Sequence, residues 1–307
     1  MMPGPNRPKS PGIIEFFERF PNEEACLDHI AMQKWGETQI CPECGEIGGL
    51  KKLKGAKKWW HSCRKQFSTC KDTIFYRSNV SVLAWFYAIF LFANSSMGMR
   101  TPFIRKQLGL GHRGAIRVCE LIRLHMASMP RPEALGGPGI LVHVDEVHLR
   151  RLISESGGPH EAAIVLGIAS QGRVMCGIVP DRKASTIIPA LLARIRPGST
   201  VVTDMHLAYS SLQRHGYRHL RINHSVAFHD FNGQTNNDIE AFWATVRRSF
   251  RSYRQVSKSN LWAYLAEIEY RYNFRHSKHL IFEDLISHFP NGILDEETQY
   301  KGRYYWI

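Results

Sequence analysis

The sequence has no apolar run long enough to span a membrane and no segment that resembles a secretory signal. Its most hydrophobic stretch, residues 82–93, has 12 residues, whereas a membrane-spanning helix needs about 20. Residues 1–12 are rich in proline and glycine and lack the apolar centre of a signal peptide. We therefore expect a disordered lead followed by a soluble, intracellular protein.

The sequence also lacks the cysteine pattern of a disulfide-stabilised protein. Its 7 cysteines are odd in number and spread over 307 residues, which favours a reducing compartment and one metal cluster. Hydrophobic residues make up 44% of the chain and charged residues 22%. This composition is that of a globular protein and excludes collagen, coiled-coil and mucin classes. The length accommodates about two domains.

Acidic residues are scarce relative to basic ones. The 40 Lys and Arg residues exceed the 27 Asp and Glu residues by 13. Most of the excess lies in residues 1–139, with 20 basic against 11 acidic residues, whereas residues 140–307 have 20 against 16. This balance predicts an anionic partner, with improved solubility as the alternative explanation.

Cysteine and histidine residues gather between positions 41 and 70. Cys41-Pro-Glu-Cys44-Gly is a knuckle that points two thiolates at one metal ion, and its glycine permits the tight turn. The second half is less regular, because WWHSCRKQFSTC offers His61, Cys63 and Cys70 in place of another CxxC. We favour a structural Zn²⁺ held by Cys41, Cys44, His61 and Cys63, with Cys70 as the alternative to His61. A degenerate ribbon without metal is the competing interpretation.

Residues 13–35 and 81–128 have apolar positions at helical spacing. The first region predicts two short helices broken at Pro21, and the second predicts three helices. The last two are joined by a Leu-Gly turn and resemble a helix-turn-helix. This pair carries Arg105, Lys106, Arg113, Arg117 and Arg123, of which the first four are candidate DNA contacts; a solvated basic face is the alternative.

Proline and glycine concentrate in residues 130–139, which we interpret as a domain boundary. Strand patterns follow at 140–151, 161–170 and 173–180, and the hairpin turn Gln171-Gly172 separates the last two. The order continues as helix, strand, helix, strand and helix. We therefore predict a mixed α/β domain that begins with an antiparallel meander.

Three acidic residues occupy positions where a carboxylate is costly to bury without a function. Asp145 lies in the first strand, Asp204 ends the strand at 199–204, and Glu240 lies on the helix at 237–250. Their hard oxygen atoms would select Mg²⁺ or Mn²⁺, ions that activate the attacking oxygen in phosphodiester chemistry.

Each acid also has a structural interpretation. Asp145 could pair with Arg150 or Arg151, and Glu146 could be the functional acid in its place. Asp204 could cap the helix that begins near His206, and Glu240 could lie on a solvated helix face.

The motifs VDE, TDxxxxY (Thr203, Asp204 and Tyr209), INHS (222–225) and TNNDIEAFW resemble, in this order, those of the DDE transposases of the Merlin superfamily and their bacterial insertion-sequence relatives. Near the start, ERFPNEEACLDHI, CPECG, CRKQFS and TIF resemble that family's zinc-ribbon region. The resemblance implies an RNase H-like catalytic domain with Asp145, Asp204 and Glu240 as the metal-binding triad. It also implies that Asn237 is the polar residue that some relatives use as the third member.

Two positions depart from the family pattern. Trp60 stands where the third ribbon cysteine is usual, and Arg247 stands where a lysine follows the catalytic glutamate, which keeps the positive charge. Arg247, Arg248 and Arg251 are further candidate DNA contacts. Phe242 and Trp243 are expected in the core, and His206, His224 and His229 are expected to be structural. The helix at 261–275 resembles the family's closing helix, which would place Asn273 and Arg275 near the site.

Together these features predict a cut-and-paste DNA transposase that binds terminal inverted repeats, cleaves transposon ends and joins the 3′-hydroxyl to target DNA by two-metal-ion phosphoryl transfer. The resemblance implies double-stranded DNA as partner, a homo-oligomer, and a nuclear location in a eukaryote or a cytoplasmic one in a bacterium. A non-enzymatic zinc-ribbon and helix-turn-helix regulator, or a structure-specific nuclease of the same fold, are the alternatives.

The predicted organisation has six parts. They are a lead (1–12), a helical entry with a zinc-ribbon-like domain (13–78), a helix-turn-helix-like region (79–129), a linker (130–139), an RNase H-like catalytic domain (140–280) and a C-terminal tail (281–307).

Overall fold

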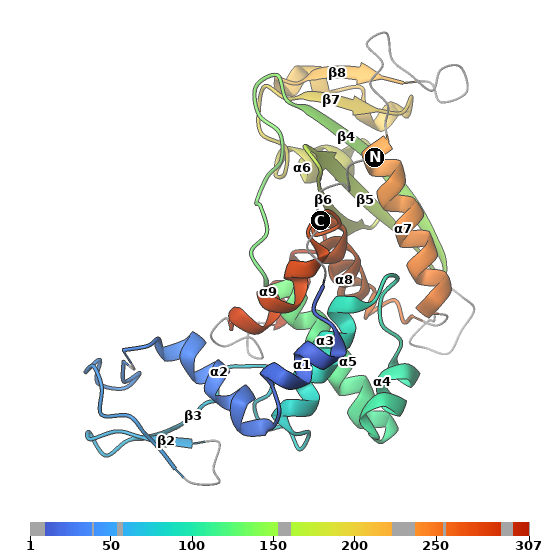
Figure 1. The fold of residues 1–307 in the computed structure, drawn as a ribbon. Coiled ribbons are helices and arrows are strands. Elements are labelled where there is room, and N and C mark those ends of the chain that lie inside the picture. Colours follow the sequence, from blue (N-terminus) through green and yellow to red (C-terminus); the bar gives the residue numbers. More distant parts are fainter. Residues whose placement is uncertain are drawn as a thin grey trace, which may run out of the picture. The chain divides into compact units, whose positions relative to one another are not determined.

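The computed structural model describes residues 10–38, 40–53, 58–152, 161–222, 237–253, 256–289 and 297–306, with the backbone alone at 151, 161, 237 and 297. The chain divides into two compact units (Figure 1). Unit 1 comprises Met1–Met129 and His276–Glu297, and unit 2 comprises Pro130–Arg275 and Thr298–Ile307. Each unit therefore combines one long segment with a short segment that is distant in sequence.

Unit 1 begins with two helices, α1 (Ile13–Arg19) and α2 (Glu23–Trp35). A three-stranded antiparallel sheet follows. The ring of Trp35 packs edge-on against Trp59 and Phe67, so α2 and this sheet share one small core. The strands are β1 (Lys51–Lys52), β2 (Lys58–Trp60) and β3 (Gln66–Ser68).

Three helices follow the ribbon, as the helical spacing predicts. They are α3 (Val82–Asn94), α4 (Thr101–Leu108) and α5 (His112–Ser128). Gly109 ends α4 with a φ of 62°, the left-handed conformation that glycine adopts without strain. Helix α4 packs on α5 across this short turn, so the structure has the two-helix arrangement expected from the sequence.

A distant helix, α9 (Ile281–Ser287), packs on α3 and completes unit 1. The ring of Phe282 contacts those of Phe16 and Phe90 at centroid distances of 5.8 Å. His125 of α5 hydrogen-bonds through Nε2 to the Leu285 carbonyl at 2.7 Å. Part of the segment expected to be a C-terminal tail thus supplies core side chains. The short elements η3 (Lys278–Leu280) and α10 (Glu297–Gly302) flank α9 in sequence.

Unit 2 is built on a five-stranded mixed sheet with the order β6-β5-β4-β7-β8. Strands β4, β5 and β6 form an antiparallel meander, and β7 and β8 run parallel to β4. This topology confirms the predicted mixed α/β fold class. The strands are β4 (Leu141–Leu152), β5 (Glu161–Ser170), β6 (Arg173–Val179), β7 (Thr200–Thr203) and β8 (Arg218–Arg221).

Helices cover both faces of this sheet (Figure 1). On one face, α6 (Ala184–Leu192) shares a core with Val142, Val144 and Leu166. On the other face, α7 (Asn237–Tyr253) packs on β4 and β5, and α8 (Leu261–Asn273) packs on β6. Because successive side chains point to opposite faces, the odd-numbered residues of β4 and β5 point toward α7.

The last described residues also belong to unit 2. The Ile178 amide donates to the Tyr304 carbonyl at 2.7 Å, and the Trp306 amide donates to the Ile178 carbonyl at 2.9 Å. The indole of Trp306 lies over Gly177, where an added Cβ would come within 2.3 Å of the ring. Glycine at 177 therefore makes room for a fully buried tryptophan.

Two smaller observations concern the helices. The segment expected to be helical after β7 contains two single 3₁₀ turns, η1 (Leu207–Tyr209) and η2 (Leu212–His215). Within the described ranges, no helix combines the length and the apolar character needed to cross a bilayer.

Candidate active site and metal cluster

Asp145 lies on the α7 face of the sheet. It pairs across the ladder with Gly167 of β5, so the two residues point to the same face. An added Cβ at Gly167 would come within 2.4 Å of Trp243 and 2.8 Å of Ile239, both on α7. Glycine at 167 therefore lets α7 approach the sheet closely beside Asp145.

Asp204 follows the end of β7 on the same face. The parallel pairing of β4 and β7 aligns Leu141 with Thr200 and His143 with Val202. The same register continued by two residues brings Asp204 beside Asp145. Like charges on adjacent strand positions destabilise a sheet, so this arrangement favours a cation near the two carboxylates.

Glu240 lies in the first turn of α7, next to the buried Ile239. Glu240 is exposed. Helix α7 packs on β4 and β5, the two strands that carry Asp145 and Gly167. Asn237 begins the helix, and its side chain lies outside the described part of the chain, as do His224, His229 and residues 223–225 of the INHS motif.

Asp145 and Asp204 share one face of the sheet, and Glu240 lies on the helix that packs on that face, but the three carboxylates do not form a closed cluster. Among the described residues, one group of three or more Cys, His, Asp or Glu side chains has its ligand atoms within 4.8 Å of one another, and that group is in the ribbon. Asp145, Asp204 and Glu240 do not meet this distance as a set. In this structure, metal coordination by all three carboxylates would therefore need a shift of side chains or of the start of α7.

Glu146, the alternative functional acid, points to the opposite face. Its carboxylate accepts a hydrogen bond from the Tyr209 hydroxyl and forms an ion pair with Arg182. Only 3% of the Glu146 side chain is exposed. Glu146 is thus engaged in a buried structural network, and the placement favours Asp145 as the acid that faces α7.

The turn after β7 holds Asp204 and Tyr209 in defined positions. Oδ1 of Asp204 accepts a hydrogen bond from the His206 amide at 2.9 Å, and His206 Nδ1 accepts from the Ala208 amide at 3.3 Å. Burial raises the pKa of Tyr209 well above its usual value, and the negative charges of Glu146, Asp204 and Asp145 add to this effect. Tyr209 therefore stays a neutral hydrogen-bond donor.

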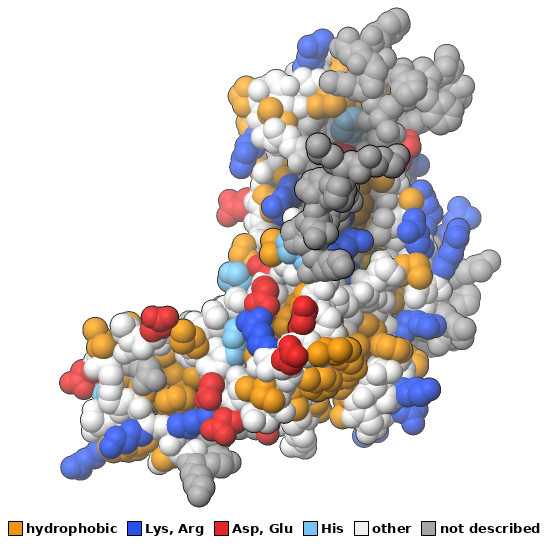
Figure 2. Space-filling model, in the orientation of Figure 1, with side chains coloured by type: hydrophobic (Ala, Val, Ile, Leu, Met, Phe, Trp, Pro, Cys, Tyr) orange, Lys and Arg blue, Asp and Glu red, His pale blue; other side chains and the backbone are white. Residues whose placement is uncertain are grey.

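Helix α7 presents a basic surface and an apolar one. Arg247, Arg248 and Arg251 are exposed, and Figure 2 shows Lys and Arg side chains gathered over α7. Phe242 and Trp243 are buried, as expected. The placement of the basic residues suits them to contact phosphate groups.

The closing helix differs from the expectation at Asn273. Its side chain forms hydrogen bonds with the amide and carbonyl of Val174 at 2.8 and 3.0 Å, so it holds the edge strand β6. Arg275 donates to the Gly172 carbonyl and lies 3.6 Å from the Asp238 carboxylate at the start of α7. Both residues therefore have structural partners.

The helix pair α4–α5 carries exposed basic residues with one exception. The exposed ones are Arg105, Lys106, Arg113 and Arg117. Arg123 is 2% exposed, donates to the Met99 carbonyl at 2.7 Å and lies over the ring of Phe92. Its expected place on the basic surface is wrong, because the guanidinium sits in the core and ties α5 to the chain before α4.

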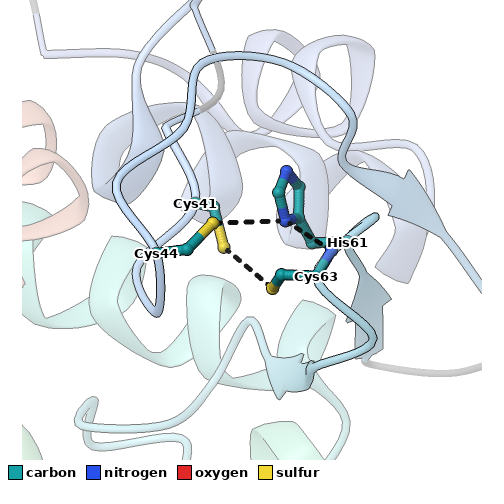
Figure 3. Close-up of side chains that lie close together, drawn as sticks. All are labelled: Cys41, Cys44, His61 and Cys63. Atoms are coloured by element: carbon teal, nitrogen blue, oxygen red, sulfur yellow. Dashed lines mark hydrogen bonds between the residues drawn. The ribbon is translucent and has the colours of Figure 1, made fainter.

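The ribbon brings together the four predicted zinc ligands Cys41, Cys44, His61 and Cys63 (Figure 3). Cys41 Sγ lies 3.9 Å from Cys63 Sγ, and Cys44 Sγ lies 3.5 Å from His61 Nδ1. Tetrahedral zinc with ordinary bond lengths separates two sulfurs by about 3.8 Å and a sulfur from a nitrogen by about 3.6 Å. The three-cysteine, one-histidine cluster is therefore compatible with zinc.

A second layer of contacts orients these ligands. The His61 Nε2 atom hydrogen-bonds to the Gly48 carbonyl at 3.1 Å, which leaves Nδ1 directed at the sulfurs. Gly45 has a φ of 75°, and its amide donates to the Cys41 carbonyl at 2.9 Å, which closes the first knuckle. Cys70, the alternative to His61, is buried outside the cluster.

Sequence reasoning missed two residues that support these sites. Arg182 reaches Glu146 from the segment between β6 and α6, and no local pattern identifies a partner so distant in sequence. Gly48 supplies a backbone carbonyl, which carries no side-chain signal. The only sequence signal near it was the Gly48-Gly49 pair, which marks a turn.

Comparisons with known proteins identify the family of the chain. Residues 138–273, which hold the mixed sheet and the three carboxylates, match the ISXO2-like transposase domain. The chain is also 32% identical over 101 residues to an uncharacterized transposase-like protein of Haemophilus influenzae, a match that covers 33% of this chain and 81% of that protein. The expected resemblance to bacterial insertion-sequence transposases is confirmed, and the chain belongs to the ISXO2-like transposase family.

Proposed function

We propose that this transposase binds the terminal inverted repeats of its element, cleaves the element's ends and joins the resulting 3′-hydroxyl to target DNA. In the first step, water attacks a phosphodiester and the 3′ oxygen leaves as a hydroxyl. In the second step, that hydroxyl attacks a target phosphodiester and displaces a target 3′ oxygen. Both are in-line phosphoryl transfers of the two-metal-ion type.

One observation carries this proposal. Asp145 of β4 and Asp204 after β7 share one face of the sheet, and Glu240 lies in the first turn of α7, the helix that packs on this face. The neighbouring acid Glu146 is withdrawn to the other face by Arg182 and Tyr209. The sheet thus separates Asp145 and Asp204 from Glu146, which is held by Arg182 and Tyr209.

The donor chemistry of the three residues fits Mg²⁺ or Mn²⁺, because carboxylate oxygens are the ligands that these ions prefer. A bound cation would supply activation of the attacking oxygen and neutralisation of charge at the reacting phosphate. Asp145 and Asp204 would hold it from the two strands, and Glu240 would close the site from α7. Asn237 is the neighbouring polar residue on the same turn.

Two groups of basic residues would contact the DNA. Arg105, Lys106, Arg113 and Arg117 on the helix pair would bind the inverted repeats, and Arg247, Arg248 and Arg251 on α7 would hold DNA beside the carboxylates. The ribbon would hold Zn²⁺ as a structural ion. Synapsis of two ends by a homo-oligomer is part of the proposal.

A single assay tests the mechanism against its alternatives. The protein is incubated with labelled terminal-repeat DNA and a target plasmid in Mg²⁺, in Mn²⁺ or in EDTA. We expect metal-dependent nicks and joined products, both abolished by Asp145→Ala or Asp204→Ala. Nicks without joining would indicate a nuclease, and salt-sensitive binding without any cleavage would indicate a regulator. Glu133→Ala, which removes an exposed carboxylate of unit 2 outside the candidate site, is the matched control and should leave cleavage unchanged.

A further inference from the structure

Unit 1 contains a cavity of about 530 Å³ that the transposition chemistry does not use. Its lining includes residues 76–80, which follow the ribbon, and Gly114 and Arg117 of α5. Trp85 of α3 contributes to the lining. None of the candidate catalytic carboxylates and none of the zinc ligands lines this cavity.

Two arginine residues from different segments of unit 1 line the cavity. Arg77 comes from the segment after the ribbon and Arg117 from α5, and both residues are exposed. Across the described stretches of the chain, neither forms an ion pair with a carboxylate. The lining includes one acid, Asp72, whose charge is opposed by the nearby ammonium group of Lys34. The charge of the cavity therefore suits an anion, and guanidinium groups bind phosphate oxygens in pairs.

Aromatic rings form a second part of the lining. The Arg77 guanidinium carbon lies 5.2 Å from the centre of the Tyr76 ring. Trp85 is 1% exposed, and its indole N–H donates to Ser78 Oγ at 2.9 Å, which fixes the ring. Nucleobases stack on aromatic rings and guanidinium planes with little regard to base identity. The cavity thus combines a phosphate-binding edge with a stacking surface.

Gly114 provides an independent indication that the cavity is kept open. It lies in the first turn of α5, and glycine is among the least favourable helix residues. The usual packing reason for glycine is absent, since the nearest heavy atom to an added Cβ would be Leu110 Cβ at 3.9 Å. Gly114 also lines the cavity, so the lack of a side chain there leaves this part of the lining uncovered.

We infer that this cavity takes one unstacked nucleotide of a DNA strand, with its phosphate on Arg77 and Arg117 and its base against Tyr76. The inference rests on the proposed function, because it assigns a nucleotide to the unit that would bind the transposon ends. It adds a single-strand contact to the duplex contacts proposed for the exposed face of the helix pair.

Binding measured in EDTA tests the site without any catalytic step. The probe is a fluorescein-labelled oligothymidylate of about ten nucleotides, within the usual range of single-strand binding sites, and a blunt duplex of equal length serves for comparison. Arg77→Ala with Arg117→Ala should weaken oligothymidylate binding on the order of tenfold or more. Arg100→Ala, which removes the same charge from the start of α4 outside the lining, should change it less than threefold, about one phosphate contact in moderate salt.

A filling variant tests the cavity itself. Gly114→Leu should abolish oligothymidylate binding yet raise the helical content or leave it unchanged, because leucine favours helix more than glycine does. Gly114→Ala should bind as the unaltered protein does. Base contact is read from a probe with one 2-aminopurine, whose fluorescence should be quenched by the unaltered protein and not by Tyr76→Ala.

Three outcomes would overturn the inference. The first is an Arg77/Arg117 defect no larger than that of Arg100→Ala. The second is full binding by folded Gly114→Leu. The third is displacement of the probe by equimolar thymidine monophosphate, which would indicate a free nucleotide as the ligand. The binding measurements contain EDTA and no cleavage step. They can therefore be interpreted even if the assay of the proposed function shows no metal-dependent cleavage. The two proposals therefore fail separately.

Discussion

The Tyr209 hydroxyl donates a hydrogen bond to Oε2 of Glu146, and this contact joins the turn that carries Asp204 to the strand that carries Asp145. Arg182 binds the other oxygen of the same carboxylate. The network lies on the α6 side of the sheet, whereas Asp145 faces α7. Neighbouring acids in one strand therefore have different roles, one in holding the sheet together and one in the proposed chemistry.

Replacing Glu146 should mainly lower the stability of the fold, whereas replacing Asp145 should mainly abolish cleavage. Glu146→Ala leaves the Arg182 guanidinium and the Tyr209 hydroxyl without their acceptor. Because Arg182 is 35% exposed, we expect a loss of about 2–3 kcal/mol in unfolding free energy, below the value for a fully buried pair. Asp145→Asn should change stability by less than about 1 kcal/mol and abolish end cleavage. Urea denaturation and the cleavage assay separate the two effects.

If the cluster holds zinc as proposed, replacing two different cysteines of the ribbon should change the zinc content differently. Cys63→Ser should remove bound zinc and unfold the ribbon, because a structural zinc ion contributes directly to folding. Cys70→Ser should keep one zinc ion per chain, since Cys70 is buried outside the cluster. Metal content by mass spectrometry of the native protein checks both. Loss of zinc in Cys70→Ser alone would contradict the ligand assignment.

The buried His125 should make the stability of unit 1 decrease in acid. Burial lowers the pKa of His125 from 6.5 to about 4, and its hydrogen bond to the Leu285 carbonyl only partly opposes this shift. Below pH 6.5 the unfolded chain takes up a proton that the folded chain refuses until about pH 4, so stability is lost as the pH falls through this window. The loss is on the order of 1.4 kcal/mol per pH unit and about 3 kcal/mol in total.

A difference measurement isolates this effect from other acidic and histidine groups. His125→Gln removes the titrating ring, so its unfolding free energy should fall less steeply between pH 6.5 and pH 4 than that of the unaltered protein. Equal slopes in urea titrations at several pH values would count against the buried histidine as the cause.

The basic residues of α7 should act through counterion release. Each of Arg247→Ala, Arg248→Ala and Arg251→Ala should reduce the slope of log affinity against log salt concentration by about 0.9 if the residue contacts a phosphate. Arg123→Met is the control, because Arg123 is buried and should alter stability without altering the slope. Anisotropy titrations across a salt series provide the slopes.

A buried ion pair in unit 2 predicts a stability effect remote from the proposed chemistry. Glu269 lies 2.9 Å from Arg131 and accepts the Cys176 amide at 2.7 Å. Burial raises the pKa of Glu269, and Arg131 opposes this. Glu269→Leu should cost about 3–5 kcal/mol by leaving the guanidinium unpaired. Adding Arg131→Met should restore part of that loss in thermal unfolding, and a double variant less stable than Glu269→Leu would refute this account.

Much of the fold was predictable because the relevant signals are local. Alternation defined β4 to β6 within one or two residues, and Gly109 marked the turn between α4 and α5. The segment after β7 was expected to form one longer α-helix but contains two 3₁₀ turns. An apolar spacing of three or four residues is compatible with an α-helix and with 3₁₀ turns. The packing of α9 on α3 depends on a contact distant in sequence, which periodicity does not encode.

The candidate sites were predictable in their residue types more than in their geometry. Spacing alone left His61 and Cys70 as alternatives, and only the folded ribbon places His61 Nδ1 beside Cys44. Alternation states that Asp145 and Glu146 face opposite ways, but it does not say which face α7 covers. Arg123 was placed wrongly because a buried arginine with a backbone partner has the same sequence signal as an exposed one.

The interleaved composition of the two units has a consequence for biosynthesis. The helix that completes the core of unit 1 is translated after the whole mixed sheet, and the tryptophan that covers Gly177 is translated later still. Neither unit can finish folding on a ribosome that has delivered only the first 275 residues. A nascent or prematurely terminated chain would therefore lack both a complete core in unit 1 and a covered sheet in unit 2, which couples any activity to synthesis beyond that point.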